Sequence, residues 1–436
     1  MLPRCVQLVS ALSVSFAVYA EIAQKFTTKG MTMENDANTS SSPCGSIRVL
    51  ELSEALAGPY CAMMLGDFGA DVIKVERPGV GDQTRAWGPP FVGPLSCYFI
   101  MTNRNKRSLA LDYTTPQGNE ILQELIARTD VLIVNSPTAA SLARREIDPE
   151  KLCAKYPRLV YCNISGYGFN GPKMGMPGYD IVAQAEGGVW SFTGKEGTDP
   201  VRYPVAIVDI STGLYSALAC LGALLTREKT GRGQFIDMAL FDTQLTWLAN
   251  IGSNYINTKQ MPTRWGNAHA SIVPYDMFHD SEGRHFIIGV GTEAHWTRFL
   301  PLIEAEETLG RDPRFVNNTE RVKNRAVLSP IVQEILAKKS AEYWVEKLNE
   351  ARIPVAKIQS VDEAVNDPQS VARNDVVGIE HPVAGMTRWV ANPCRLASTP
   401  PSYRLPPPML GEHTDQILQE LGYPENPAAG KAASVK

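Results

Sequence analysis

A single carboxylate, Asp209, lies within the apolar run 205–210 and is followed at once by Ser211, Thr212 and Gly213. The small apolar residues that come next predict a buried helix. An acid here can cap that helix by accepting bonds from its first free N–H groups, as can Ser211. It can also be a nucleophile, fixed between a strand end and small residues where a substrate can approach it. This stretch alone favours the cap, so the choice depends on the rest of the chain.

Cations gather at the boundaries of other predicted strands. Arg77 closes a strand-like run, with Lys74 and Arg85 nearby, and residues 103–107 place three cations in five positions. A guanidinium can stack on a flat base or bind a phosphate with two hydrogen bonds. Together these cations suit an extended phosphorylated ligand, although for each residue alone a solvated basic turn is the simpler interpretation.

Strand-like and helical segments alternate through the first half of the chain. Residues 46–52 alternate as a strand, residues 60–68 have helical spacing, and residues 71–75 form a second short apolar run. This order is a βαβ unit and predicts a parallel sheet. The pattern recurs with strand-like residues at 107–111, 131–134 and 159–165 and an amphipathic helix at 117–128. The sequence therefore predicts an α/β fold with a Rossmann-like sheet, which binds ligands at the carboxyl ends of its strands.

A glycine-rich motif follows the strand-like segment 159–165. Residues 166–171 match G-x-G-x-x-G, which must open a helix in a dinucleotide-binding site. Pro172 and the KMGMPG segment that it precedes cannot form a first helical turn. We therefore interpret the motif as a loop and reject a dehydrogenase.

The composition changes near Thr258. We predict one long helix over 241–256 and a smaller α+β domain whose strands lie within 264–278 and 284–290, followed by helices to about 348. Later segments predict a strand and turn, a hairpin, an extended proline-rich stretch and a terminal helix, at 354–361, 376–390, 397–408 and 413–421. The predicted domains are a leader with linker, a large domain, a small domain, a return segment that completes the large domain, and a disordered tail, at 1–44, 45–257, 258–351, 352–423 and 424–436.

The composition is that of an ordinary globular protein. The chain has 436 residues, of which 44% are hydrophobic and 20% charged, and a net charge of −4. A nucleic-acid partner would require a basic face, so none is predicted. The eight cysteines contain no C-x-x-C pair and the six histidines no H-E-x-x-H pair. We therefore expect reduced thiols in an intracellular protein and no metal.

The first residues differ from the rest of the chain. The apolar run 6–20 follows Arg4 and is too short to span a membrane, so no membrane partner is expected. Glu21 is the only acid before Glu34, which favours a mitochondrial targeting segment. Secretion fits badly with eight unpaired cysteines, and a cytoplasmic location is the alternative.

Six segments, in order along the chain, resemble the class III CoA-transferases, the formyl-CoA and carnitine CoA-transferase family. These segments are residues 57–85, 103–112, 166–172, 177–188, 208–234 and 409–423. The resemblance covers roughly residues 45–423. Residues 264–275, RWGNAHASIVPY, further resemble the members that use succinyl-CoA and dicarboxylic acids such as glutarate, hydroxymethylglutarate, malate or itaconate.

The resemblance implies that Asp209 is the nucleophile, because the family's catalytic aspartate lies in a motif that VDISTG matches. Asp209 would attack an acyl-CoA thioester, giving an aspartyl mixed anhydride and the CoA thiolate. The thiolate then forms an enzyme–CoA thioester, and the acceptor carboxylate repeats the exchange in reverse. Such a site must exclude water, and backbone N–H groups near glycines are the expected oxyanion donors. CoA is then a substrate, and no tightly bound cofactor is expected.

Further positions are implied to bind CoA. They are Leu56 and Ala57 at the thiol end, Arg77 beside the adenine, Leu111 near the nucleotide, Asn135 in a loop, Arg144 on the phosphate side, and Tyr179 and Asp180 along the pantetheine channel. The chain departs from the family pattern where VNSPTA replaces ENFxPG and where Leu56 replaces the glutamine of formyl-CoA transferases. Residues 265–271 also replace a glycine-rich lid, which argues against formate or oxalate as substrates.

Substrate choice is predicted to depend on Arg264, His269 and Ser271. One or more of them would bind the distal carboxylate of a dicarboxylic acid. For His269 a hydrogen bond within its own loop is an equal alternative.

The resemblance also implies the class III CoA-transferase fold, with a Rossmann-like large domain, a smaller α+β domain and an interlocked homodimer. Two alternative functions follow from the same superfamily. An α-methylacyl-CoA racemase reads GHD where this chain reads GYD, and Tyr179 removes the histidine of its proton-transfer pair. A catalytically silent CoA-binding protein is the other alternative, against which the intact VDISTG segment argues.

Overall fold

The computed structural model describes residues 42–423. The chain divides into Met1–Ser42 and Pro43–Lys436, so most of the predicted leader and the whole predicted tail lie outside the described residues. Cys44 is buried, and its N–H donates to the carbonyl of Phe68 at 2.9 Å. The packed part of the chain therefore begins slightly before the predicted boundary at 45.

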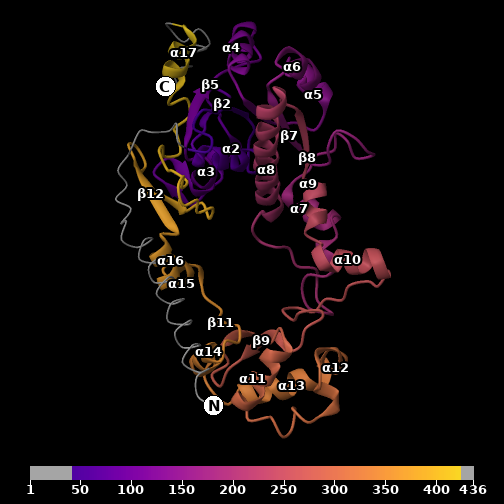
Figure 1. Cartoon of the computed structure of the whole chain (residues 1–436). Coiled ribbons are helices and arrows are strands. Elements are labelled where there is room, and N and C mark those ends of the chain that lie inside the picture. The colour runs from indigo at the N-terminus through magenta and orange to yellow at the C-terminus, as the bar shows by residue number, and fades with distance from the viewer. Residues whose placement is uncertain (1–41, 424–436) are drawn as a thin grey trace, which may run out of the picture. The chain divides into compact units, whose positions relative to one another are not determined.

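A six-stranded parallel sheet forms the centre of the large domain (Figure 1). Its spatial order is β5 (Lys106–Ala110), β2 (Asp71–Glu76), β1 (Arg48–Leu52), β6 (Val131–Asn135), β7 (Val160–Ser165) and β8 (Phe235–Ala239). Counted along the chain, this is the 3-2-1-4-5-6 order of doubly wound folds, with the switch point between β1 and β6. The predicted α/β class and Rossmann-like sheet are confirmed.

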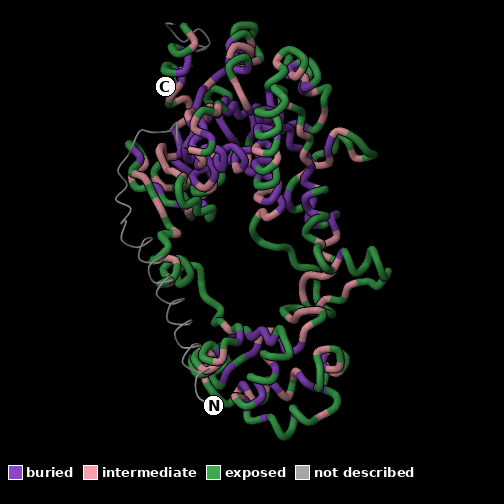
Figure 2. Tube along the Cα trace, viewed as in Figure 1, coloured by how far each residue is buried: buried purple, intermediate pink, exposed green. Residues whose placement is uncertain are grey.

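Helices cover both faces of the sheet, and the buried residues follow it (Figure 2). Because side chains alternate along a strand, Val49 faces one core and Leu50 the other. The first core is shared with α2 (Ala57–Asp67) and α8 (Ile207–Thr230). The second is shared with α4 (Pro116–Ala127), α6 (Pro149–Lys155) and α17 (Thr414–Leu421).

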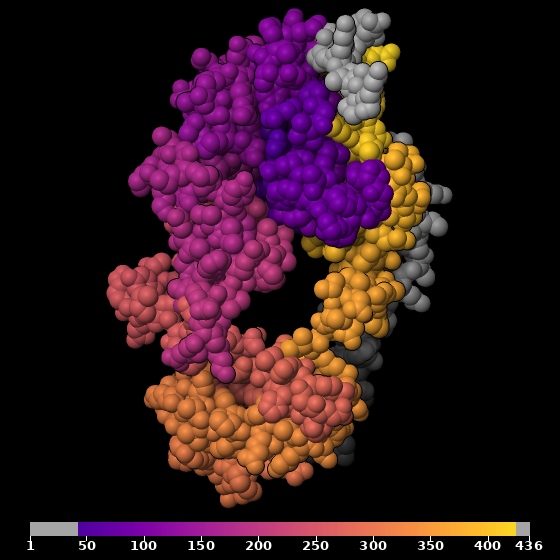
Figure 3. Space-filling model, turned by 180° about the vertical axis from the view of Figure 1, so that it is seen from behind, coloured from indigo at the N-terminus to yellow at the C-terminus, as the bar shows by residue number. Residues whose placement is uncertain are grey.

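The C-terminal segment returns to the edge of this sheet, where Figure 3 shows its yellow surface against the indigo surface of the first described residues. The Ala110 N–H donates to the Thr414 hydroxyl at 3.0 Å, and Arg107 pairs with Glu420 at 2.8 Å. The hairpin of β12 (Val376–His381) and β13 (Gly385–Val390) precedes this return, and Trp389 of β13 packs with Phe99 of α3 (Cys97–Thr102).

A smaller α+β unit carries its own core around Phe286, Phe299 and Trp344. Its antiparallel sheet orders β11 (Val355–Lys357), β10 (His285–Gly289) and β9 (Tyr275–His279). Its main helices are α11 (Glu293–Leu302), α13 (Arg325–Leu336) and α14 (Ala341–Glu350). Since β11 pairs with β10, residues 355–357 belong to this unit, whereas the sequence predicted that the return to the large domain begins at 352.

Two local predictions were wrong. The helix predicted over 241–256 is interrupted between α9 (Leu240–Thr246) and α10 (Ala249–Thr258), because Ala249 takes a φ of 44°, in the left-handed region. Residues 264–274 form only one bridge, Lys195 to Trp265, because the polar groups of this segment bind neighbouring loops.

The described residues include free thiols and one long apolar helix. Every cysteine that the structure describes is a free thiol. Within residues 42–423, α8 is long and apolar enough to cross a bilayer, but half of that stretch is buried in the fold. No group of three or more His, Cys, Asp or Glu among these residues could hold a metal ion.

Candidate active site

Asp209 lies in the first turn of α8, and the residues before it, 201–206, form no strand. The predicted strand-to-helix corner is therefore wrong. The predicted cap is wrong as well, because Ala206 is the N-cap and no side chain of its own helix caps it. Ser211 instead donates its hydroxyl back to the carbonyl of Ile207 at 2.6 Å. In residues 42–423 nothing donates a hydrogen bond to the Asp209 carboxylate, which is thus available for chemistry.

Asp180, the first residue of α7 (Asp180–Glu186), stabilises the start of α8. One carboxylate oxygen accepts the Val208 N–H at 2.8 Å, and the other accepts the Gln184 amide at 2.6 Å. The sequence left open whether this buried acid touches a ligand or caps a helix, and the structure shows that it caps α8. It thereby fixes the turn that carries Asp209, while the neighbouring Tyr179 is 59% exposed.

Burial raises the pKa of Asp209 to about 7, and the negative charge of Asp180 adds to the rise. Tyr98 on α3 lies close enough to sense both acids: its burial and then their charges raise its pKa to about 12. Tyr98 is consequently a protonated phenol beside the site at neutral pH. Sequence reasoning missed it, since nothing in its segment distinguishes it from a core aromatic.

The first turn of α2 approaches the same part of α8. Gly213 lies one helical turn after Asp209 on the same face. A Cβ on Gly213 would lie 2.7 Å from the Ala57 carbonyl oxygen and 2.9 Å from the Tyr60 Cβ, so no larger residue fits without a shift. The N-cap Leu56 makes no side-chain cap bond, Pro59 has no N–H, and the Tyr60 N–H donates to the Leu56 carbonyl at 2.8 Å, so the N–H groups of this turn that the described residues leave free are those of Ala57 and Gly58. Donors suited to an oxyanion or a thiolate are thus placed beside the turn of Asp209.

Most residues predicted to bind CoA follow the carboxyl ends of the strands. Leu56 and Ala57 follow β1, Arg77 follows β2, Leu111 follows β5, and Asn135 ends β6. These strands are neighbours in one parallel sheet, so their ends meet at the edge where doubly wound folds bind ligands. Leu56 and Leu111 are buried and can contribute backbone groups and shape, whereas Arg77 and Asn135 are exposed.

Two guanidinium groups are available for phosphate. Arg77 and Arg144, the latter at the C-cap of α5 (Ala139–Ala143), are both exposed. Among the described residues neither side chain has a hydrogen bond or ion pair. Both therefore keep all their donors for a ligand.

The three predicted substrate residues are held by their own surroundings. Arg264 donates to the carbonyls of Thr198 at 2.6 Å and Ser191 at 3.3 Å. The His269 ring nitrogen Nδ1 accepts the Ser271 N–H at 3.1 Å, which is the loop-internal bond considered from the sequence. Across residues 42–423, no hydrogen bond or ion pair joins these three to Asp209 or Asp180. The structure thus does not bring the predicted substrate residues and the predicted nucleophile, Asp209, into direct contact.

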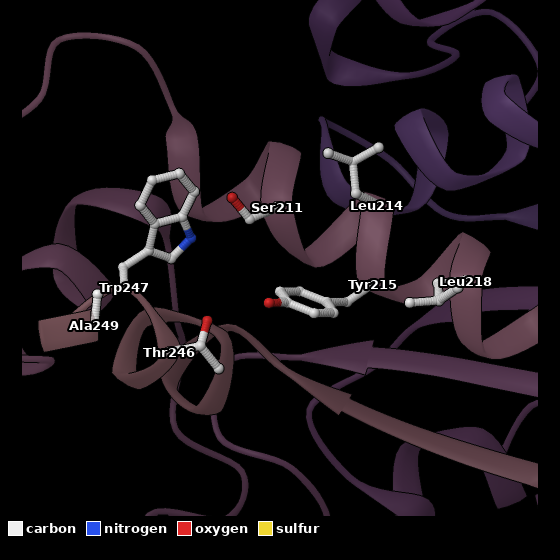
Figure 4. Close-up of a pocket in the computed structure, with 7 residues that line it drawn as sticks. All are labelled: Ser211, Leu214, Tyr215, Leu218, Thr246, Trp247 and Ala249. Carbon is white, nitrogen blue, oxygen red and sulfur yellow. The ribbon is translucent and has the colours of Figure 1, made fainter. Parts of the chain in front are cut away.

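A cavity of about 400 Å³ lies on another side of α8. Its lining residues are Ser211, Leu214, Tyr215, Leu218, Thr246, Trp247 and Ala249, which Figure 4 shows around a common space. Leu218 is 65% exposed. Asp209 does not line this cavity, so it is distinct from the site described above.

Residues 45–414 match the profile of CoA-transferase family III. The chain is 37% identical over 392 residues to the succinyl-CoA:glutarate CoA-transferase of Homo sapiens, covering 90% of this chain and 89% of the relative. It is 38% identical over 385 residues to the succinate–glutarate CoA-transferase of Agrobacterium fabrum, covering 87% of this chain and 96% of that relative. A solved structure of a CAIB/BAIF family protein from Brucella suis superposes with a TM-score of 0.76 at 38% identity, covering 87% and 99%. The profile match extends from before β1 to the start of α17.

Proposed function

The chain belongs to CoA-transferase family III, and from this premise we propose that it moves CoA from succinyl-CoA to a dicarboxylic acid, with Asp209 as nucleophile. One observation carries the proposal. Asp209 combines a pKa of about 7 with an unbonded carboxylate one helical turn before Gly213, the point where α8 meets the first turn of α2. The named relatives supply the substrate class, since those matched in human and Agrobacterium fabrum transfer CoA between succinate and glutarate.

The proposed reaction proceeds through two covalent adducts of Asp209. The carboxylate attacks the thioester carbonyl, the carbon–sulfur bond breaks, and an anhydride and CoA thiolate form. The thiolate then attacks the aspartyl carbonyl, releases succinate and leaves an aspartyl thioester, which the acceptor acid reverses in two matching steps. A raised pKa makes Asp209 a stronger nucleophile, and the N–H groups of α2 stabilise each tetrahedral oxyanion. The phenol of Tyr98 is a further protonated donor near these charges.

We expect transfer to lose activity as the pH falls through about 7. Protonated Asp209 is no nucleophile, so kcat/KM for succinyl-CoA should fall about tenfold per pH unit below that value. In Asp180→Asn the neighbouring charge is gone, while an amide oxygen can still accept the Val208 N–H. The fall in kcat/KM on the acid side of the pH profile should therefore begin at a lower pH. The two pH profiles measure the shift. A wild-type limb near pH 4 would contradict the raised pKa.

For the acceptor we propose that Arg264, His269 and Ser271 bind the distal carboxylate. The Nε and Nη1 groups of Arg264 donate to carbonyls, so its Nη2 group remains available to a ligand. In His269 the Nδ1 atom accepts a hydrogen bond, so the Nε2 atom remains available. The test is a panel of mono- and dicarboxylic acids incubated with succinyl-CoA, with hydroxylamine trapping of the Asp209 adducts and mass spectrometry to locate them. Arg264→Ala should raise KM for glutarate about tenfold or more while leaving KM for succinyl-CoA unchanged. An unchanged glutarate KM would remove Arg264 from the site.

We propose that two copies form an interlocked homodimer. The outer side of α8 and the start of α10 expose apolar side chains around the cavity of Figure 4. Together these side chains form a larger apolar patch than singly exposed surface residues form. Interlocked chains must assemble as they fold, so Leu218→Asp should prevent assembly and the purified variant should sediment as a monomer. Val383→Asp, on the turn of the β12–β13 hairpin and 63% exposed, should sediment as the wild type does. A dimeric Leu218→Asp variant would place the interface elsewhere.

A mitochondrial location is also part of the proposal, and it rests on the apolar run 6–20 with few acids. Residues 1–44 fused to a fluorescent protein should direct it to mitochondria, and a cytoplasmic signal would reject this.

No observation favours the racemase alternative, because both carboxylate oxygens of Asp180 already accept hydrogen bonds from the protein.

A further inference from the structure

Two fully buried lysines lie beneath residues 53–59, which comprise the loop after β1 and the first turn of α2 and are called the loop 53–59 below. Lys74 Nζ donates to the Ser53 carbonyl at 2.8 Å, and Lys106 Nζ donates to the Pro59 carbonyl at 2.9 Å. Both ammonium groups contact one carboxylate, Glu51, at 2.7 and 2.8 Å. Each end of the loop is thus held by a cation, and one acid joins the two cations.

The loop between these two points has an unusual backbone. Ala55 takes a φ of 69°, which non-glycine residues adopt only where the surroundings enforce it. Its N–H donates to Asp82 at 3.2 Å, and Asp82 also pairs with Lys74 at 2.9 Å. The same buried charges therefore reach the strained centre of the loop as well as its ends.

The charges in this cluster balance. Glu51 and Asp82 oppose Lys74 and Lys106, and all four side chains are buried. A balanced buried cluster is rigid, because moving one member leaves another charge unpaired in a medium of low dielectric. The reaction described above does not use any of the four, so their position below the loop requires another explanation.

We propose that Lys74 and Lys106 are positioning residues that hold the loop 53–59 so that the free N–H groups of α2 face the carbonyl reacting with Asp209. This inference rests on the proposed function, because it assigns the donors of that reaction to α2. When the loop relaxes, the oxyanion loses its donors and water gains access, so transfer slows and hydrolysis of the donor rises.

The protonation of the Lys106 amine makes its hold on the loop 53–59 sensitive to pH. Burial lowers the pKa of Lys106 to about 8, although Glu51 and Asp82 act in the opposite direction. The groups that face it are Glu51 on β1, Lys74 on β2, Asp82, the Asn103 amide oxygen, and Cys61 with the Pro59 carbonyl on α2. Above about pH 8 the amine becomes neutral, and a neutral amine holds a carbonyl far more weakly than an ammonium does.

The test compares Lys106→Met with the double variant Lys106→Met/Glu51→Gln and with Lys151→Met on the surface of α6. The single variant leaves two buried acids, Glu51 and Asp82, opposed by one lysine and should unfold at lower urea concentration. The double variant keeps Lys74 paired with Asp82, so its urea midpoint should return close to that of the wild type. Its kcat/KM for transfer from succinyl-CoA to glutarate should nevertheless stay at least tenfold low. Amide exchange over 53–60 should stay at least tenfold faster, and Lys151→Met should match the wild type.

A merely structural role predicts a different result, since restored stability would restore transfer and slow exchange together. That outcome in the double variant would overturn the proposal. A second measurement needs no variant: in the wild type the protection factors over 53–60 should fall as the pH rises through about 8, and constant factors would also overturn it. If the wild type transfers no CoA at all, the proposed function fails, and exchange alone then decides whether the lysines hold the loop.

Discussion

Replacing Asp209 with asparagine should abolish CoA transfer, lowering kcat on the order of 10³-fold or more. The amide keeps the shape of the side chain but cannot form the anhydride or the thioester that the exchange requires. CoA binding should survive, because the residues predicted to hold CoA lie at the ends of β1, β2, β5 and β6 and are unchanged. Turnover at saturating succinyl-CoA and glutarate, together with a Kd for CoA from calorimetry, checks both expectations.

The same substitution should stabilise the fold at alkaline pH. Burial raises the pKa of Asp209 from 3.8 to about 7, so the folded state disfavours the ionised form. The free energy of unfolding therefore falls as the pH rises from about 4 to about 7 and stays low above that. At pH 8 Asp209→Asn should exceed the wild type by about 2–4 kcal/mol, and at pH 4 the gain should nearly vanish. Urea unfolding at the two pH values measures it.

A suitable control is Asp242→Asn, because Asp242 also lies in the first turn of a helix, α9, but is exposed. It should leave both turnover and the pH dependence of unfolding at wild-type values. If Asp209→Asn kept its turnover, some other group would have to form the covalent adduct, and the proposed mechanism would be rejected.

The sheet could be predicted from the sequence because each strand is a short apolar run bounded by turn residues. That local signal placed β1, β2 and β6, and with them the positions of Leu56, Arg77 and Asn135 at the sheet edge where doubly wound folds bind ligands. Asp209 could be proposed as the nucleophile only through the family resemblance, since its segment alone favours a cap.

The remaining features depend on contacts between distant residues. Asp180 caps α8 through Val208, 28 positions later in the chain, and no local pattern indicates such a cap. Residues 264–274 have a strand-like composition, but Arg264 donates to the carbonyls of Thr198 and Ser191. This segment therefore adopts a loop conformation instead of joining a sheet. The pairing of Lys74 and Lys106 through Glu51 likewise requires three strands to be side by side.

Replacing Gly213 with alanine should impair both stability and transfer. The added Cβ would lie 2.7 Å from the Ala57 carbonyl oxygen, a backbone atom that cannot rotate away, and 2.9 Å from the Tyr60 Cβ. Helix α8 must therefore move away from the first turn of α2, which should lower the free energy of unfolding by about 1–3 kcal/mol. A shift of about 1 Å between Asp209 and its donors should lower kcat about 10²-fold. Urea unfolding and steady-state turnover measure the two effects.

Gly222 on the same helix separates crowding from helix propensity. A Cβ there meets nothing within 4 Å, so Gly222→Ala should stabilise the protein by about 0.5–1 kcal/mol and leave kcat unchanged. If Gly213→Ala behaved like Gly222→Ala, the close approach of α8 to α2 would not matter for the reaction. The opposite signs expected for these two substitutions arise because only Gly213 lies on the side of α8 that faces α2, one turn after Asp209.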